Sequence, residues 1–127
     1  MKQIFFNMPH SIDKVAKIIF DSLGLNSFEE GDSSHVKDGI YYASSVFGIK
    51  VQLEGNSYDY DDQYSYMLSI KQDVLSAVYS DDLIVAEIAN VIIRLLREAL
   101  ETEIAYEDNS NTLRLYSDLT VKAFGTN

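Results

Sequence analysis

Residues 49 to 71 read IKVQLEGNSYDYDDQYSYMLSIK, which is two alternating patterns around an acidic, tyrosine-rich insert. Apolar or aromatic side chains take every second position on both sides of the insert: Ile49, Val51, Leu53, then Tyr64, Tyr66, Leu68 and Ile70. A period of two is the spacing at which side chains share one face of a β-sheet. The pattern therefore predicts two antiparallel strands, each with one buried face, and places the insert on the surface connection between them.

The segment just before this pair, residues 40 to 47, is rich in Tyr, Val and Phe, which favour strands. It forms either a strand of its own or one that continues through a bulge at Gly48 into the next. Tyr41 and Tyr42 are adjacent, so only one of them can face the core on a regular strand.

The amino-terminal part predicts a short strand followed by a helix. Residues 2 to 7 hold the β-favouring run from Ile4 to Phe6. Pro9 suits the edge of a helix and Ser11 is a good N-cap. Apolar residues then recur at helical spacing until Gly24, the expected left-handed stop.

The carboxyl-terminal half predicts a second helix and more strands. Asp81 and Asp82 open the helix, where carboxylates complement its dipole. Apolar residues cover most of its circumference, so we expect it to be largely buried. After it, residues 104–108 and 113–116 predict a hairpin, and residues 119–123 predict a further edge strand.

These elements predict the fold class. The sequence has no repeat, no low-complexity segment and no Pro/Gly-rich linker. Residues 1–127 are therefore expected to form a single α+β domain. Its antiparallel sheet packs against two main helices, in the approximate order β-α-β-β-β-α-β-β.

The charge of the chain limits the partners that it can bind. Acidic residues outnumber basic ones by 20 to 10, which gives a formal net charge of -10. Division after Gln63 leaves ten acids and five bases in each half, so the excess belongs to the folded body rather than to a tail. Nucleic-acid binding needs Lys and Arg against phosphates, and an anionic membrane repels an acidic surface. We therefore expect a basic protein partner, and neither nucleic acid nor membrane.

The cellular compartment is predicted from what the sequence lacks. Cysteine is absent, which fits a reducing compartment. The first apolar run, Ile4 to Phe6, is far shorter than the about 7–15 residues of a secretory signal core. No apolar run approaches the ~20 residues of a membrane span. These features predict a soluble, cytoplasmic protein.

No catalytic signature is recognisable. Without Cys, a nucleophile would have to be Ser or Thr activated by a base, and the two histidines, His10 and His35, sit in no motif of that kind. We therefore predict that the protein is not an enzyme and needs no cofactor.

Asp59, Asp61 and Asp62 carry the oxygen ligands that a calcium site uses. On the EF-hand template, however, Tyr64 takes the place of the turn glycine and Ile70 that of the bidentate Glu. We therefore predict no metal. A small enzyme or divalent-cation-binding protein that uses the loop from Asp59 to Asp62 remains an alternative.

The insert itself is the predicted partner-binding surface, and we call it the Tyr/Asp insert. Clustered carboxylates attract Lys and Arg, while Tyr rings supply large, stiff contact area. Its predicted contact residues are Glu54, Tyr58, Asp59, Tyr60, Asp61, Asp62 and Tyr64. Tyr64 is also an even number of residues from Leu68 and Ile70, so the alternation predicts that it faces the core with them. Glu29, Glu30, Asp32 and the acids of residues 98–108 are further candidates for this surface.

The region of residues 39 to 72 combines Gly39-Ile40-Tyr41-Tyr42, Phe47-Gly48-Ile49-Lys50-Val51, the Tyr/Asp insert and the Tyr-rich strand after it. In these features it resembles bacterial toxin-immunity proteins of the contact-dependent growth inhibition type. The resemblance implies cytosolic binding to a cognate toxin domain, frequently a nuclease, whose basic substrate-binding surface is blocked. A regulatory adaptor with no toxin involved is a further alternative.

Overall fold

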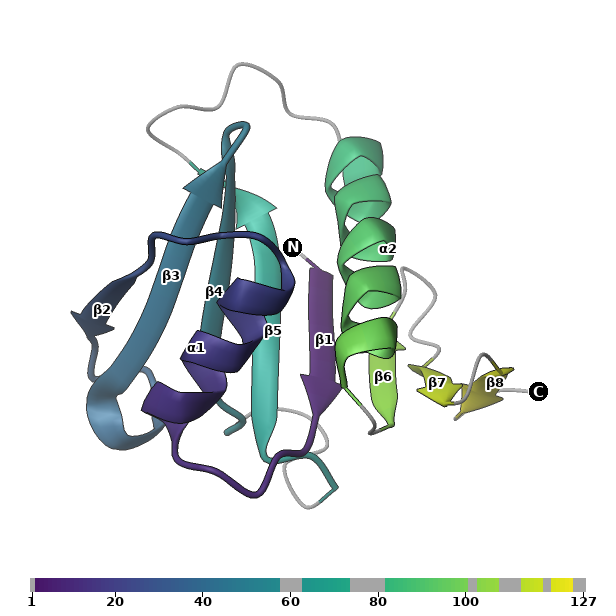
Figure 1. Cartoon of the computed structure of the whole chain (residues 1–127), viewed down its shortest axis with the longest axis horizontal. Coiled ribbons are helices and arrows are strands. Elements are labelled where there is room, and N and C mark those ends of the chain that lie inside the picture. Colours follow the sequence, from purple (N-terminus) through teal and green to yellow (C-terminus); the bar gives the residue numbers. More distant parts are fainter. Residues whose placement is uncertain are drawn as a thin grey trace.

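The computed structural model describes residues 2–57, 63–73, 82–100, 103–107, 113–117 and 120–124. Their elements are β1 (Lys2–Phe6), α1 (Ile12–Ser22), β2 (Glu29–Asp32), the short 3-10 helix η1 (Lys37–Gly39), β3 (Ile40–Val46), β4 (Ile49–Gly55), β5 (Tyr66–Gln72), α2 (Asp82–Ala99), β6 (Ile104–Glu107), β7 (Leu113–Ser117) and β8 (Thr120–Phe124). Within the described ranges, eight strands form one antiparallel sheet in the order β2-β3-β4-β5-β1-β6-β7-β8 (Figure 1). The predicted α+β class is confirmed, and β2 is a strand that the sequence pattern did not predict.

The strand that begins the chain occupies the middle of the sheet. β1 lies between β5 and β6, where Ile4 pairs with Leu68 on one side and Tyr106 on the other (Figure 1). Chain neighbours β2 to β5 form one side of the sheet and β6 to β8 the other. β1 therefore joins two units that are otherwise separate in the sheet.

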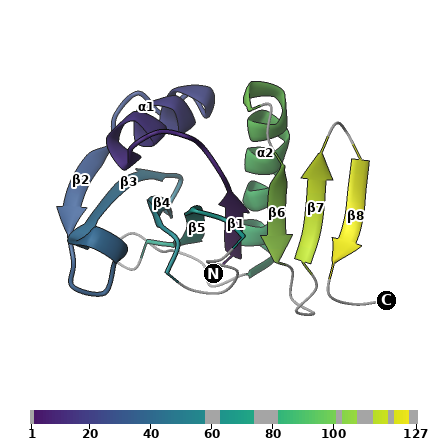
Figure 2. The same ribbon diagram turned by 90° about the horizontal axis from the view of Figure 1, so that it is seen from below.

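Both helices lie on the same side of the sheet, as the view in Figure 2 shows. α1 packs against β4, α2 packs against β5 and β1, and the two helices contact each other. α1 buries Val15, Ala16, Ile19 and Phe20, which recur at helical spacing. It ends as predicted, because Gly24 adopts a φ of 71° just past its last turn.

The hairpin of β3 and β4 resolves the alternatives for residues 40 to 47. Val46 pairs with Ile49, so only Phe47 and Gly48 form the turn, and both have positive φ, 53° and 74°. Two consecutive residues of this kind make a type I′ turn, whose twist matches that of the strands. Residues 40 to 46 are therefore a strand of their own, with a turn rather than a bulge at Gly48.

The face of the sheet that carries no helix is also buried at its centre. Phe5, Tyr64, Met67 and Ala105 form a second apolar cluster there, separate from the main core. Phe5 and Phe6 are both completely buried, although neighbouring residues on a strand point to opposite faces. The centre of the sheet is therefore buried on both sides, where the alternating pattern predicted only one buried face.

Candidate protein-binding surface

The Tyr/Asp insert connects two adjacent antiparallel strands, as predicted. At the end of the ladder, Glu54 of β4 pairs with Met67 of β5, and Gly55 pairs with Tyr66. The central residues of the predicted surface, 58 to 62, are Tyr58, Asp59, Tyr60, Asp61 and Asp62, and they lie outside the described residues. Only the two ends of the insert are therefore placed.

Two asparagines hold the described ends of the insert. The Asn7 amide donates to the carbonyl oxygen of Gln63 at 2.8 Å and accepts from the backbone N–H of Ser65 at 2.8 Å. The buried Asn56 donates from its side chain to the carbonyl oxygen of Tyr64 at 3.0 Å. Because Asn7 directly follows β1, these bonds connect the insert to the central strand of the sheet.

Tyr64 is buried rather than available to a partner. Its side chain is 4% exposed and packs against Phe5, with 6.3 Å between the ring centroids. Its hydroxyl donates to Oε2 of Glu103 at 2.7 Å. Burial first, and then this carboxylate, raise the pKa of Tyr64. The predicted role of Tyr64 in contacting a partner is thus corrected: its ring and hydroxyl are already occupied within the protein.

The face of the sheet on which Tyr64 packs also differs from the prediction. β5 begins only at Tyr66, whose ring stacks on Phe6 in the main core, whereas Tyr64 belongs to the cluster on the opposite face. The alternation of side chains between the two faces of the sheet runs from Ile70 back to Tyr66 and does not continue past the bend at Ser65. The alternation therefore predicted burial correctly and the face wrongly.

Glu54 is also buried, which corrects its predicted exposure to a partner. Its side chain is 4% exposed. Gln52 donates to Oε1 at 3.1 Å, and within the described part of the chain Oε2 is buried without a hydrogen-bond partner. Burial is the main cause that raises the pKa of Glu54, and the Gln52 bond and the charge of Lys71 oppose it. Alternation put Glu54 on the polar face of β4, and that face is covered near the Phe5 cluster.

The first of the additional acidic segments, Glu29 to Asp32, is the edge strand β2. Glu29, Glu30 and Asp32 are all exposed. Glu30 also accepts a hydrogen bond of 2.8 Å from the hydroxyl of Tyr42, and this bond is the main cause that raises the pKa of Tyr42 to about 12. Tyr42 is buried, so it is the one of the two adjacent tyrosines that faces the core.

Tyr41 takes the other face of β3 and completes this edge. Its ring lies so close to Gly31 that a Cβ there would come within 2.2 Å of it. Nζ of Lys50 lies 5.5 Å from the centroid of the same ring. Tyr41, Lys50 and acids of β2 border an open hollow of about 470 Å³. The described edge of the sheet is therefore an acidic surface that also carries the rings of Phe28 and Tyr41 and the cation of Lys50.

Carboxylates dominate the described surface. The exposed acids are Asp13, Asp21, Glu29, Glu30, Asp32, Asp38, Glu87, Glu98 and Glu103. The exposed Lys and Arg side chains are Lys14, Lys17, Lys37 and Arg94. Nine acids against four bases, among described side chains, give a surface that attracts cations from several directions.

An apolar groove between the helices was not predicted from the sequence. It has a volume of about 240 Å³. The described residues that line it are all apolar: Leu23, Leu25, Val46, Phe47, Val51, Ile88, Val91, Ile92 and Leu95. Val91 and Leu95 of α2 are 52% and 38% exposed, and Phe47 is 86% exposed. The prediction that α2 is largely buried is therefore correct for its sheet-facing side and wrong for the side toward this groove.

Metal-ligating side chains do not cluster in the described residues. No three side chains of His, Cys, Asp or Glu gather there in a way that could hold a metal ion. His35 is exposed, and the carbonyl of His10 accepts a hydrogen bond from the hydroxyl of Tyr66. Neither α1 nor α2, as described, has the length and apolar character that a membrane-crossing helix needs.

The chain was compared with protein-family models, with curated proteins and with solved structures, and none of the three comparisons found a match.

Proposed function

We propose that this protein is a cytosolic inhibitor that binds a basic toxin domain and neutralises it. The observation that supports the proposal best is the surplus of exposed carboxylates, nine acids to four bases among the described side chains. These acids come from α1, β2, α2 and the segments between them, so the surplus is a property of the folded surface.

A nuclease fits this surface best as the partner. Its active site must present Lys and Arg to phosphates, and carboxylates on an inhibitor can replace those phosphates. An acidic field also raises the rate of association with a basic protein by about 10–10³-fold at low salt. Fast capture matters for an inhibitor, because the toxin must be bound before it acts.

The Tyr/Asp insert stays in the proposal as the centre of the contact surface, through Tyr58, Asp59, Tyr60, Asp61 and Asp62. Glu54 and Tyr64 have a supporting role, since both are buried at its ends. Glu29, Glu30 and Asp32 of β2 are exposed and strengthen the acidic field around that contact. A small enzyme or cation-binding protein that uses the same loop, and a regulatory adaptor, are the alternatives.

We expect a gene adjacent to that of this protein to encode the cognate toxin, and the test uses that toxin. Its purified nuclease domain should digest plasmid DNA, and an equimolar amount of this protein should stop digestion, whereas an unrelated protein of similar net charge should not. Digestion that continues at tenfold excess would contradict the proposal. Calorimetric titration with Ca²⁺, Mg²⁺ and Zn²⁺ covers the first alternative, because micromolar or tighter binding of one of them would support a cation site instead.

A further inference from the structure

The apolar groove lies beside the part of α2 that packs on the sheet. The side chains of α2 that face the sheet are fully or nearly fully buried: Val85, Ala89, Ile92, Ile93 and Leu96. Val91 and Leu95, which lie four residues apart and so one above the other, add an exposed apolar strip beside them. Leu23 and Leu25, just after α1, form the other side of the groove, and Val51 of β4 also lines it.

Phe47 at the edge of the groove is an unusual residue for its backbone conformation. A bulky residue at a φ of 53° is uncommon, and the first position of a type I′ turn favours Asn, Asp or Gly. Its ring is also 86% exposed, which has a solvation cost. Phe47 therefore adds an exposed aromatic ring to the edge of the apolar groove.

The chemistry of the groove selects its occupant. A small metabolite needs a few polar groups to orient it, and every described lining residue is apolar. The volume of about 240 Å³ exceeds the roughly 150 Å³ of a cavity that accepts benzene, so one large apolar side chain fits.

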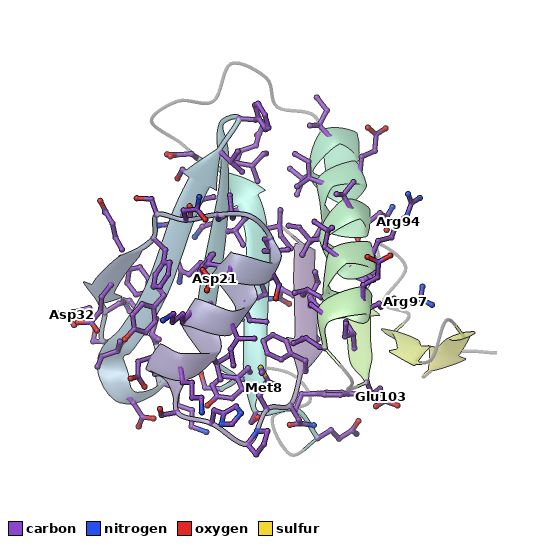
Figure 3. The ribbon with its side chains drawn as sticks, viewed as in Figure 1. Met8, Asp21, Asp32, Arg94, Arg97 and Glu103 are labelled. Atoms are coloured by element: carbon purple, nitrogen blue, oxygen red, sulfur yellow. The ribbon has the colours of Figure 1, made fainter. Side chains whose placement is uncertain are left out.

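Charges beside the groove indicate what flanks that side chain. Glu87 lies one turn before Val91 on α2, Glu98 lies three residues after Leu95, and both are exposed. Asp21 is exposed near the end of α1 (Figure 3). Arg94 and Arg97 extend from the side of α2 that faces away from α1 (Figure 3). The surface of α2 next to the groove is therefore acidic on the side of the apolar strip.

We infer that the groove receives a large apolar side chain from a basic partner protein, in a segment that places Lys or Arg on either side of it. This inference rests on the proposed function for the identity of the partner and adds a hydrophobic anchor to an acidic surface. Anchors of this kind supply most of the affinity in protein interfaces, while charge sets rate and specificity. A second copy is a poor occupant, because each copy has a net charge of -10 and the acids beside the groove would face each other.

The probe is a pair of synthetic helical peptides with the same number of Lys residues, one with a single Leu between the Lys residues and the other with Ala at that position. The Leu peptide should bind at least tenfold more tightly than the Ala peptide, and its addition should shift the amide NMR signals of Val91, Leu95 and Leu23. Equal affinity for the two peptides would overturn the inference, because charge alone would then explain binding.

Variants at the groove locate the effect. Val91→Ser with Leu95→Gln should remove the preference for the Leu peptide, whereas Asn90→Ser, at an exposed position of the same helix, should keep it. Phe47→Asn is a second, independent variant at a turn where Asn is favoured, and it should reduce the preference without unfolding the protein. Circular dichroism checks that each variant is folded.

The two proposals can fail separately. A toxin domain that is inhibited equally by wild type and by Val91→Ser with Leu95→Gln would overturn the groove inference and leave the proposed function standing. If the protein discriminated between the two peptides but inhibited no nuclease, the proposed function would be overturned and the groove inference would stand. Sedimentation equilibrium covers the second copy, because a wild-type dimer that the double substitution makes monomeric would assign the groove to self-association.

Discussion

At the scale of single residues, Glu54 is the group whose charge is least compatible with its surroundings. Its carboxylate is almost completely buried, and one of its oxygens accepts from Gln52 while the other has no partner among the described residues. Burial raises the pKa of this carboxyl group, so the folded protein holds the proton more tightly than the unfolded chain does. The neutral form therefore stabilises the fold below the ordinary pKa of Glu, and this stabilisation is lost as the pH rises through the raised value.

Glu54→Gln should remove this dependence on pH. At pH 7 we expect a gain of about 1 kcal/mol in the free energy of unfolding, because a buried charge without full hydrogen bonding is replaced by a neutral group. The gain should shrink as the pH falls toward the range in which Glu54 itself is neutral. Urea unfolding at pH 7 and at pH 4 measures both effects, with Glu98→Gln, an exposed carboxylate of α2, as control. A wild type that is more stable than Glu54→Gln at pH 7 would show that the negative charge has a partner.

At the scale of secondary-structure elements, the β3–β4 turn is the clearest point where backbone conformation and residue type disagree. Gly48 suits its φ of 74°, but Phe47 has a φ of 53°. Gly48→Ala should lower the free energy of unfolding by about 1 kcal/mol, because a side chain at positive φ is strained.

Phe47→Asn should leave stability unchanged or raise it by about 0.5 kcal/mol, since Asn-Gly is a preferred type I′ pair. Thermal unfolding measures both, and a large loss of stability in Phe47→Asn would show that the ring is needed for folding.

Local periodicity explains which elements the sequence predicted. α1, β4 and α2 carry patterns of period 3.6 or two that their packing uses directly, so their positions were predicted within a residue or two. β1 was predicted equally well from its continuous β-favouring run. β2 was missed because its Glu-Glu-Gly-Asp sequence has low strand propensity, and its pairing with β3 depends on tertiary contacts such as the Tyr41 ring over Gly31.

The same limit applies to the candidate site. Acidity and the hairpin connection can be predicted from composition and alternation. The burial of Tyr64 depends on Phe5 and Ala105, which are distant in sequence and join it in one cluster only in the folded sheet. Glu54 is buried beside Met67 of the same cluster. The presence of Phe5 directly before Phe6 was a usable signal, because two adjacent buried rings on a strand require apolar surroundings on both faces.

At the scale of the whole molecule, the net charge of -10 should make association with a basic partner depend steeply on salt. Exposed charges interact over a Debye length of about 8 Å at physiological ionic strength, so added salt weakens attraction at a distance before it weakens packed contacts. Stopped-flow mixing with the toxin domain should show an association rate that falls as salt rises, with a smaller change in the dissociation rate. A constant association rate would mean that the acidity serves only to keep the protein dispersed.

Charge reversal separates the role of the Tyr/Asp insert from that of net charge. Two double variants change the charge of the molecule equally. One is Asp61→Lys with Asp62→Lys in the insert, and the other is Glu29→Lys with Asp32→Lys on β2. Glu29 and Asp32 are exposed on β2, and they make a better control than Glu30, whose carboxylate accepts a hydrogen bond from the Tyr42 hydroxyl.

Both double variants should slow association, because both weaken the acidic field of the protein. Only the Asp61 and Asp62 variant should also speed dissociation and cost about 2–5 kcal/mol of binding free energy, since charges in direct contact are lost and replaced by repulsion. Equal losses in the two variants would remove any special role of the insert and leave the surface charge as a whole as the basis of binding.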